Sequence, residues 1–212
     1  MSERTLVHVV RHGEVFNPAK ILYGRLPNFH LSELGRAMAD RVADELAGRD
    51  ITYVVASPLE RAQETAAPIA KRHGLAVASD PQLLEAINVF QGLTFGVGDG
   101  SMRRPTHWKH LRNPLRPSWG EPYVELAARM RAGVEAARDN AAGHEAVVVS
   151  HQLPIEILRR SLTHRKLWHR PDRRMCALAS VTTIAYDGDV LADVTYADHC
   201  AGMVAGPSVP GA

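Results

Sequence analysis

Two short apolar runs, far apart in the chain, each end in polar residues that include a histidine. Residues 6–10 (LVHVV) lead into Arg11-His12-Gly13-Glu14, and residues 146–149 (AVVV) lead into Ser150-His151. Short apolar runs of this kind are typical of strands that are buried in a parallel sheet. Because charged and imidazole groups are expensive to bury without partners, two such strand ends indicate one site built from both halves of the chain.

Strand signals alternate with helical patterns along the sequence. The first strands are expected at about residues 5–10, 52–56, 76–78 and 145–149. Near the C-terminus, residues 181–186 and 190–196 flank Asp187-Gly188-Asp189, which predicts a hairpin and makes the last strand antiparallel. The alternation favours a three-layer α/β/α sandwich, with a mostly parallel sheet and an antiparallel edge strand. Ligands of such sheets bind beyond the carboxyl ends of the strands, where His12 and His151 fall.

Helix signals fill the gaps between the strands. Ser32 can cap a helix with an apolar stripe that consists of Leu34, Met38, Val42 and Leu46. A second helix is expected to start at Pro58 and run through Arg72, and Pro68 should kink or split it. Two more helices are expected at about residues 121–140 and 154–162.

The chain of 212 residues is expected to form a single domain over residues 1–200, followed by a disordered tail at residues 201–212. Residues 86–120 differ from the rest because they hold many Gly and Pro residues and no clear period. This insertion carries five Arg and Lys residues against one acid, Asp99. We expect it to form a basic lid over the site that selects the substrate through Arg103, Arg104 and Lys109.

The residues around the two histidines suit the transfer of a phosphoryl group. That reaction needs an in-line nucleophile, positive charge on the equatorial oxygens and an acid for the leaving oxygen. His12 can be the nucleophile, because neutral imidazole attacks phosphorus near pH 7. Arg11, Arg61 and His151 can supply the positive cradle, since Arg makes forked hydrogen bonds to phosphate oxygens. Glu14 follows directly and could orient a ring or an arginine.

These residues fall in four blocks that resemble the histidine phosphatase superfamily, in the branch that includes phosphoglycerate mutases. The blocks are Arg11-His12-Gly13-Glu14, Leu31-Ser32-Glu33-Leu34-Gly35, residues 57–66 (SPLERAQETA) and Ser150-His151. Four spaced blocks in the right order are a specific signal, whereas the first block alone is a weak one. The resemblance covers most of the chain except residues 86–120 and the tail.

The resemblance implies a role for each matching residue. His12 matches the histidine that becomes phosphorylated, and Arg11, Arg61 and His151 match the phosphate pocket. Glu85 matches the position of the proton donor. The expected catalytic residues are therefore His12, Glu85 and His151.

Two departures from the family pattern affect this interpretation. Asn17 resembles the asparagine of the phosphate pocket, but it lies one residue closer to the histidine than in the common pattern. The mutases' Glu-x-x-Tyr-Gly is absent, and Phe90-Gln91-Gly92 meets the usual sequence after the acid only in part. The second departure favours a phosphatase over a mutase.

We therefore expect a metal-independent phosphomonoester hydrolase that works through a phosphohistidine and needs no cofactor. Two alternatives stay open: a phosphoglycerate mutase that depends on 2,3-bisphosphoglycerate, and a non-catalytic binder of phosphorylated ligands. We expect no metal site, because His107 and His110 lie three residues apart without further ligands. The expected partner is a small phosphorylated metabolite, which the sequence does not name.

Other partners are not expected. Residues 159–174 hold seven Arg and Lys residues against Asp172, and they are expected to form a solvated face. The net charge is only +2, which argues against nucleic acid, and no stretch approaches the ~20 apolar residues of a membrane span. Cys176 and Cys200 form no CxxC pair, so we expect free thiols and a cytoplasmic protein. A homodimer stays open.

Overall fold

One mixed sheet runs through the middle of the fold, in the computed structural model that describes residues 3–94 and 120–203. Its strands follow the order β3-β2-β4-β1-β5-β6. They are β1 (Arg4–Arg11), β2 (Ile51–Ala56), β3 (Val77–Ser79), β4 (Glu145–Ser150), β5 (Val181–Asp187) and β6 (Val190–Ala197).

The pairing of the strands matches the predicted sheet. β4 pairs in parallel with β1 and with β2, and β2 pairs in parallel with β3. The C-terminal hairpin adds the antiparallel part, because β5 runs antiparallel to β1 and β6 runs antiparallel to β5. The prediction of a mostly parallel sheet with an antiparallel edge is therefore confirmed.

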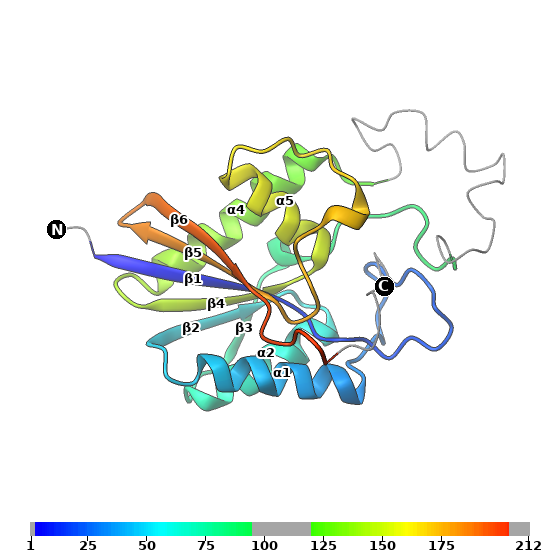
Figure 1. The fold of residues 1–212 in the computed structure, drawn as a ribbon, viewed down its shortest axis with the longest axis horizontal. Helices are drawn as coiled ribbons and strands as arrows, with labels where there is room; N and C mark the ends of the chain where they lie inside the picture. Colours follow the sequence, from blue (N-terminus) through cyan, green and yellow to red (C-terminus); the bar gives the residue numbers. More distant parts are fainter. Residues whose placement is uncertain (1–2, 95–119, 204–212) are drawn as a thin grey trace.

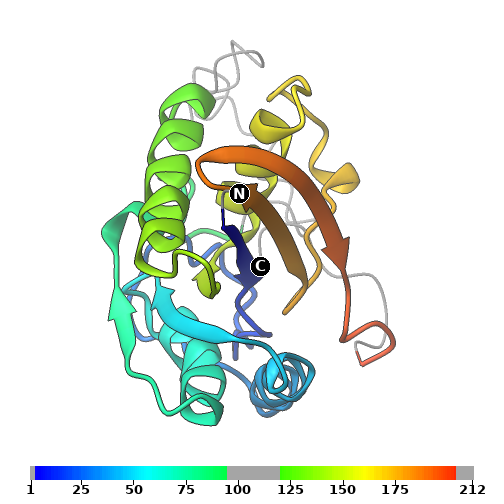
Figure 2. The same ribbon diagram turned by 90° about the vertical axis from the view of Figure 1, so that its left-hand side faces the viewer.

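Helices cover both faces of the sheet, as the apolar strands require (Figures 1 and 2). Helices α1 (Glu33–Leu46) and α2 (Glu60–Arg72) lie on one face, and α4 (Tyr123–Asn140) and α5 (Gln152–Leu162) lie on the other. β1 alternates between the two cores: Val7 and Val9 join the cluster under α4 and α5, whereas Val10 joins the cluster under α1 and α2. This burial on both faces explains why the strand reads as a continuous apolar run.

Two prolines bear on the predicted second helix. The second helix begins after Leu59, which is its N-cap residue, so Pro58 lies before the helix and not in its first turn. Pro68 does not split α2, which runs unbroken from Glu60 to Arg72. The buried side chains of Ala66 and Ile69 on either side of Pro68 pack into the core, and this packing outweighs the lost backbone hydrogen bond.

The remaining expectations concern the termini and the cysteines. Residues 201–203 of the predicted tail are described, and Met203 packs against the core under α1 and α2, whereas residues 204–212 lie outside the described residues. Cys176 and Cys200 are both free and buried, and burial raises the pKa of each thiol to about 11. In the described part of the chain, no helix combines the length and the apolar character that a membrane crossing requires.

Candidate active site

The ends of β1 and β4 bring the two predicted histidines together. The parallel register sets Arg11 beside Ser150, and the His12 backbone N–H donates to the Ser150 carbonyl at 3.0 Å. The ring centroids of His12 and His151 are 5.1 Å apart. Both rings are buried. The two halves of the chain therefore share one site, as the strand ends predicted.

Glycines allow the loop after β1 to pack against the start of α1. A Cβ on Gly35 would lie 2.0 Å from the Glu14 carbonyl oxygen, so only glycine fits. Ser32 caps α1 by accepting from the Gly35 N–H at 2.9 Å, and its hydroxyl donates to Glu14 Oε2 at 2.5 Å. Glu14 was expected to orient a ring or an arginine; the contact that the structure gives its carboxylate is this one, which anchors the cap of α1.

His12 is held in the form that a nucleophile needs. Its Nδ1 lies 2.8 Å from the Gly13 carbonyl oxygen and must carry the hydrogen, since a carbonyl only accepts. Burial, together with the charges of Arg61 and Arg11, holds the pKa of His12 well below its usual range. The ring is therefore neutral, with its lone pair on Nε2.

Arg61, on the first turn of α2, is a fully buried cation with unused donors. Its Nη2 donates to the Gly24 carbonyl at 2.6 Å, and its guanidinium lies 4.7 Å from the centre of the Tyr23 ring. Its Nε and Nη1 are buried and have no hydrogen-bond partner among the described residues. Buried donors without partners are costly, so these two indicate a place for an anion.

Thr65 ties α2 to the loop after β1. Its hydroxyl donates to the Arg61 carbonyl at 2.7 Å and accepts from the Gly13 N–H at 3.1 Å. The helix that carries Arg61 is thus fastened to the loop that carries His12. This contact gives a structural role to a residue that the sequence analysis quoted only as part of a block.

His151 presents a second unused donor. Its Nε2 lies 2.9 Å from Ser57 Oγ, which also accepts weakly from the Leu59 N–H at 3.5 Å. We assign the Ser57 hydroxyl as the donor to Nε2, which places the hydrogen of the neutral ring on Nδ1. Nδ1 is buried without a partner in residues 3–94 and 120–203. Burial is the main reason that the pKa of His151 lies well below its usual range.

Glu85 lies at a cavity of about 280 Å³, which Arg11 and His12 also line. The Glu85 side chain is half-buried, and its Oε1 accepts from the Ala86 N–H at 2.8 Å. Burial raises the pKa of this carboxyl above its ordinary value, although Arg61 and other nearby cations oppose the shift. A carboxyl with a raised pKa can hold the proton that a general acid delivers.

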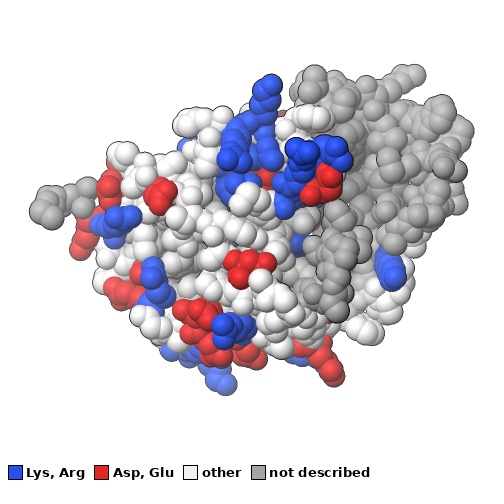
Figure 3. All heavy atoms as spheres, in the orientation of Figure 1, with Lys and Arg blue, Asp and Glu red and all other residues white. Residues whose placement is uncertain are grey.

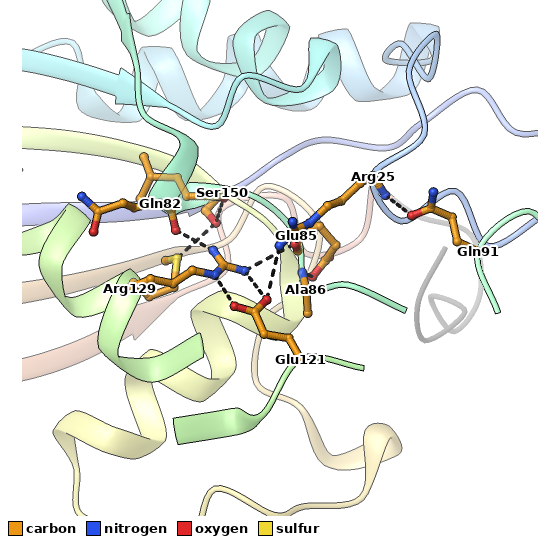
Figure 4. Close-up of polar contacts among 10 residues, drawn as sticks. Arg25, Gln82, Glu85, Ala86, Gln91, Glu121, Arg129 and Ser150 are labelled. Atoms are coloured by element: carbon orange, nitrogen blue, oxygen red, sulfur yellow. Dashed lines mark hydrogen bonds and ion pairs between the residues drawn. The ribbon is translucent and has the colours of Figure 1, made fainter. Parts of the chain in front are cut away.

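The backbone of Glu85 is held by two arginines that the sequence analysis did not identify (Figure 4). Arg25 Nε donates to the Glu85 carbonyl at 2.5 Å, and Arg129 Nη2 donates to it at 3.3 Å. The Glu121 carboxylate pairs with Arg129 at 2.6 Å and with Arg25 at 3.3 Å. These residues come from three distant segments, so no local sequence pattern could have revealed the cluster.

Asn17 does not reach the cavity. Its Nδ2 donates to the Ile21 carbonyl at 2.8 Å, and its Oδ1 accepts from the Ile21 N–H at 3.2 Å. The amide therefore closes a loop, and Asn17 is not among the lining residues that the structure describes. The expected phosphate contact of Asn17 has no support in this geometry.

The described residues include only the ends of the predicted insertion at residues 86–120, and they leave out the two histidines that were considered as metal ligands. Ala86, Ile87 and Asn88 line the cavity, so the insertion starts beside the site. Its predicted lid residues Arg103, Arg104 and Lys109 lie outside the described residues, as do His107 and His110. Where the structure is described, no group of three or more His, Cys, Asp or Glu side chains is arranged to hold a metal ion.

Comparison with known proteins relates this chain to the family that the four sequence blocks resemble. Residues 7–199 match the model of the histidine phosphatase superfamily, branch 1. A protein of Mycobacterium tuberculosis strain H37Rv, named uncharacterized protein Rv0525, is 63% identical over 201 residues, which are 95% of this chain and 100% of that protein. The probable phosphoglycerate mutase GpmB of Yersinia pestis strain Pestoides F is 32% identical over 158 residues, 72% of each chain.

A solved structure shares both the fold and part of the sequence. It is a mycobacterial glucosyl-3-phosphoglycerate phosphatase, Rv2419c, in complex with VO3. The match has a TM-score of 0.72 at 28% identity and covers 92% of this chain and 97% of that one.

Proposed function

This chain belongs to the histidine phosphatase superfamily, as its four sequence blocks predicted, and within that family we propose that it is a metal-independent phosphomonoester hydrolase acting through a phosphohistidine. One observation carries the proposal. The neutral ring of His12 stands beside buried, unpartnered donors of Arg61 and His151. A nucleophile next to unused donors is the arrangement that an incoming phosphate group requires.

The proposed reaction has two steps. In the first, Nε2 of His12 attacks phosphorus, the P–O bond to the leaving group breaks, and Glu85 gives its proton to the leaving oxygen. In the second, water attacks the phosphorus, Glu85 takes a proton from that water, and the N–P bond breaks to release phosphate. Arg11, Arg61 and His151 donate hydrogen bonds to the phosphoryl oxygens throughout.

A mutase is the second candidate. One relative is named a probable phosphoglycerate mutase, and one structural neighbour is named a phosphatase. Both activities are therefore candidates for this chain. The absence of the mutases' Glu-x-x-Tyr-Gly supports the phosphatase. The substrate, which we expect to be a small phosphorylated metabolite, and the expected cytoplasmic location both remain predictions.

Three assays on purified protein test the proposal, and the two hydrolysis assays contain EDTA because the proposed steps use only protein side chains. We expect 4-nitrophenyl phosphate to be hydrolysed, and a screen of phosphorylated metabolites to identify better substrates. A coupled phosphoglycerate mutase assay should show no activity, with or without 2,3-bisphosphoglycerate. Phosphate binding without any turnover would indicate a binder instead, and mutase activity that exceeds hydrolysis would favour the second candidate.

Replacement of Glu85 by glutamine should affect poor leaving groups most. General acid catalysis contributes about 10²–10⁴-fold, and it matters most when the leaving oxygen is strongly basic. We therefore expect Glu85→Gln to lower kcat/KM, which reports the phosphorylation step, by about 10²-fold or more for alkyl phosphates and much less for 4-nitrophenyl phosphate. Equal losses of kcat/KM on the two substrates would remove Glu85 from the role of general acid.

The dependence of kcat/KM on pH should be bell-shaped, after correction for the ionisation of the substrate. Activity needs neutral His12, whose pKa lies well below 6.5, so it is lost as the pH falls through that lowered pKa. Activity also needs protonated Glu85, whose pKa lies above 4.5, so it is lost as the pH rises through that raised pKa. The Glu85→Gln variant should lose the alkaline limb and keep the acid limb; an unchanged alkaline limb would contradict the assignment.

A further inference from the structure

The basic run at residues 159–174 does not form one solvated face. Arg159 and Arg160 pair with the buried Glu156 at 2.9 and 2.6 Å, and Arg170 pairs with Asp172 at 2.8 Å. Figure 3 shows blue Lys and Arg side chains clustered on the surface over the segment that follows α5. Arg170 and Arg174 both line the cavity that contains His12, but only Arg174 of these two makes no ion pair with a described residue.

The contacts of Arg174 orient its guanidinium without neutralising it. Its Nε donates to His169 Nε2 at 3.1 Å, and its Nη1 donates to Gln152 Oε1 at 3.0 Å. His169 Nδ1 donates to the Leu167 carbonyl at 2.7 Å, so Nε2 is the unprotonated acceptor and the ring is neutral. Within the described ranges, Arg174 makes no ion pair. Arginine has five N–H donors, so three remain for a ligand.

Hydrogen bonds connect the backbone on the C-terminal side of Arg174 to α5 and to Arg11 of the proposed phosphate pocket. The Met175 N–H donates to the buried Glu156 carboxylate at 3.2 Å. The carbonyl of the following residue, Cys176, accepts from Arg11 Nη1 at 2.8 Å. Gln152, which orients the guanidinium, directly follows His151 in the chain. A cation held in this way loses little conformational freedom when it binds an anion.

The other groups of the cavity leave the charge of Arg174 available. Glu121 is paired with Arg129 and Arg25, and burial raises the pKa of Glu85, which favours its neutral form. The remaining walls are largely apolar or aromatic, and they include Leu22, Tyr23, Tyr123, Leu153 and Trp168. Arg170 also lines the cavity, but it is paired with Asp172. Besides Arg11, the cavity thus combines a nucleophile, flat apolar walls and, in Arg174, a cation that makes no ion pair with a described residue.

We propose that Arg174 binds a second anionic group of the substrate, and that the apolar and aromatic walls hold the body of the molecule between this group and the reacting phosphate. The proposal rests on the proposed function, because it places the first anion at His12. It names a substrate class: phosphomonoesters with a second anion, carried on an apolar or aromatic body.

Binding of non-hydrolysable probes tests the proposal without turnover. Benzylphosphonate carries one anionic group, 4-carboxybenzylphosphonate adds a carboxylate, and 1,4-xylylenediphosphonate adds a second phosphonate. By calorimetry, wild-type protein should bind at least one of the two longer probes about 10- to 100-fold more tightly than benzylphosphonate, as expected for a charged hydrogen bond. The preferred probe shows whether the second anion is a carboxylate or a phosphate-like group.

Three variants complete the test. Arg174→Gln should remove the preference for the second anion, whereas Arg174→Lys should keep part of it because the charge remains. Arg173→Gln removes the same charge from the neighbouring exposed residue and should keep the full preference. The subsite is wrong if wild-type protein shows no preference or if Arg174→Gln retains it.

Phenyl phosphate separates failure of the subsite from failure of the proposed function. Hydrolysis of phenyl phosphate without a preference dependent on Arg174 contradicts the subsite alone. A preference dependent on Arg174 without any hydrolysis contradicts the proposed function alone. If Arg174 instead acts only through the nearby Glu85, Arg174→Gln will shift the pH profile for phenyl phosphate and leave the binding preference unchanged, which also contradicts the subsite.

Discussion

Replacement of His12 by alanine should lower the turnover of phosphomonoesters by roughly 10⁴-fold or more and abolish the phosphoenzyme. The reason is that Nε2 of His12 is the atom that bonds to phosphorus in the proposed reaction. The ring is held in place by a hydrogen bond to the carbonyl of the adjacent Gly13. Removal of the ring therefore breaks no hydrogen bond of the side chain to a distant described residue. The variant should therefore keep the native fold while it loses activity.

Acid and alkali distinguish the expected intermediate from other phosphoproteins. Wild-type protein that is quenched during turnover of a ³²P-labelled substrate should retain acid-labile, alkali-stable label, as expected of a phosphohistidine, and His12→Ala should retain none. The matched control is His144→Ala, which removes an exposed histidine near the start of β4. Wild-type turnover in His12→Ala, or label at another residue in the wild type, would contradict the mechanism.

Replacement of Arg61 by methionine should separate activity from stability. The change removes two buried, unpartnered donors, so kcat/KM should fall by roughly 10³-fold while the ligand-free protein loses little stability or gains some. The Gly24 carbonyl loses its partner, which offsets part of any gain. Arg61→Lys should retain more activity than Arg61→Met, because it keeps the charge but not the planar fork.

Thermal unfolding with and without inorganic phosphate gives the second readout. A ligand at 100 times its Kd stabilises a protein by about 2.7 kcal/mol, so phosphate should raise the Tm of the wild type. Arg61→Met should lose this rise, and the control Arg72→Met, at the exposed end of the same helix, should keep it. A full phosphate-induced rise in Arg61→Met would mean that Arg61 does not hold the anion.

The sequence alone determined which strand ends carry the site. Its apolar runs specify strands buried on both faces, and parallel strands must present their carboxyl ends at one edge of the sheet. That geometry was enough to predict that His12 and His151 would meet. Ser32, as a cap before an amphipathic stripe, was likewise a local signal that the structure bears out.

Tertiary structure decided which partner each polar side chain found. Glu14 binds Ser32, and Asn17 closes its own loop. Arg174 lines the cavity, whereas Arg159 and Arg160 of the same basic run pair with Glu156. Pro68 stays in a continuous helix because the core on either side of it holds the helix together. Periodicity and capping depend on neighbours within a few residues, and a sequence displays them directly. Polar pairing depends on segments that meet only after the chain has folded, as Arg25 and Arg129 do at Glu85.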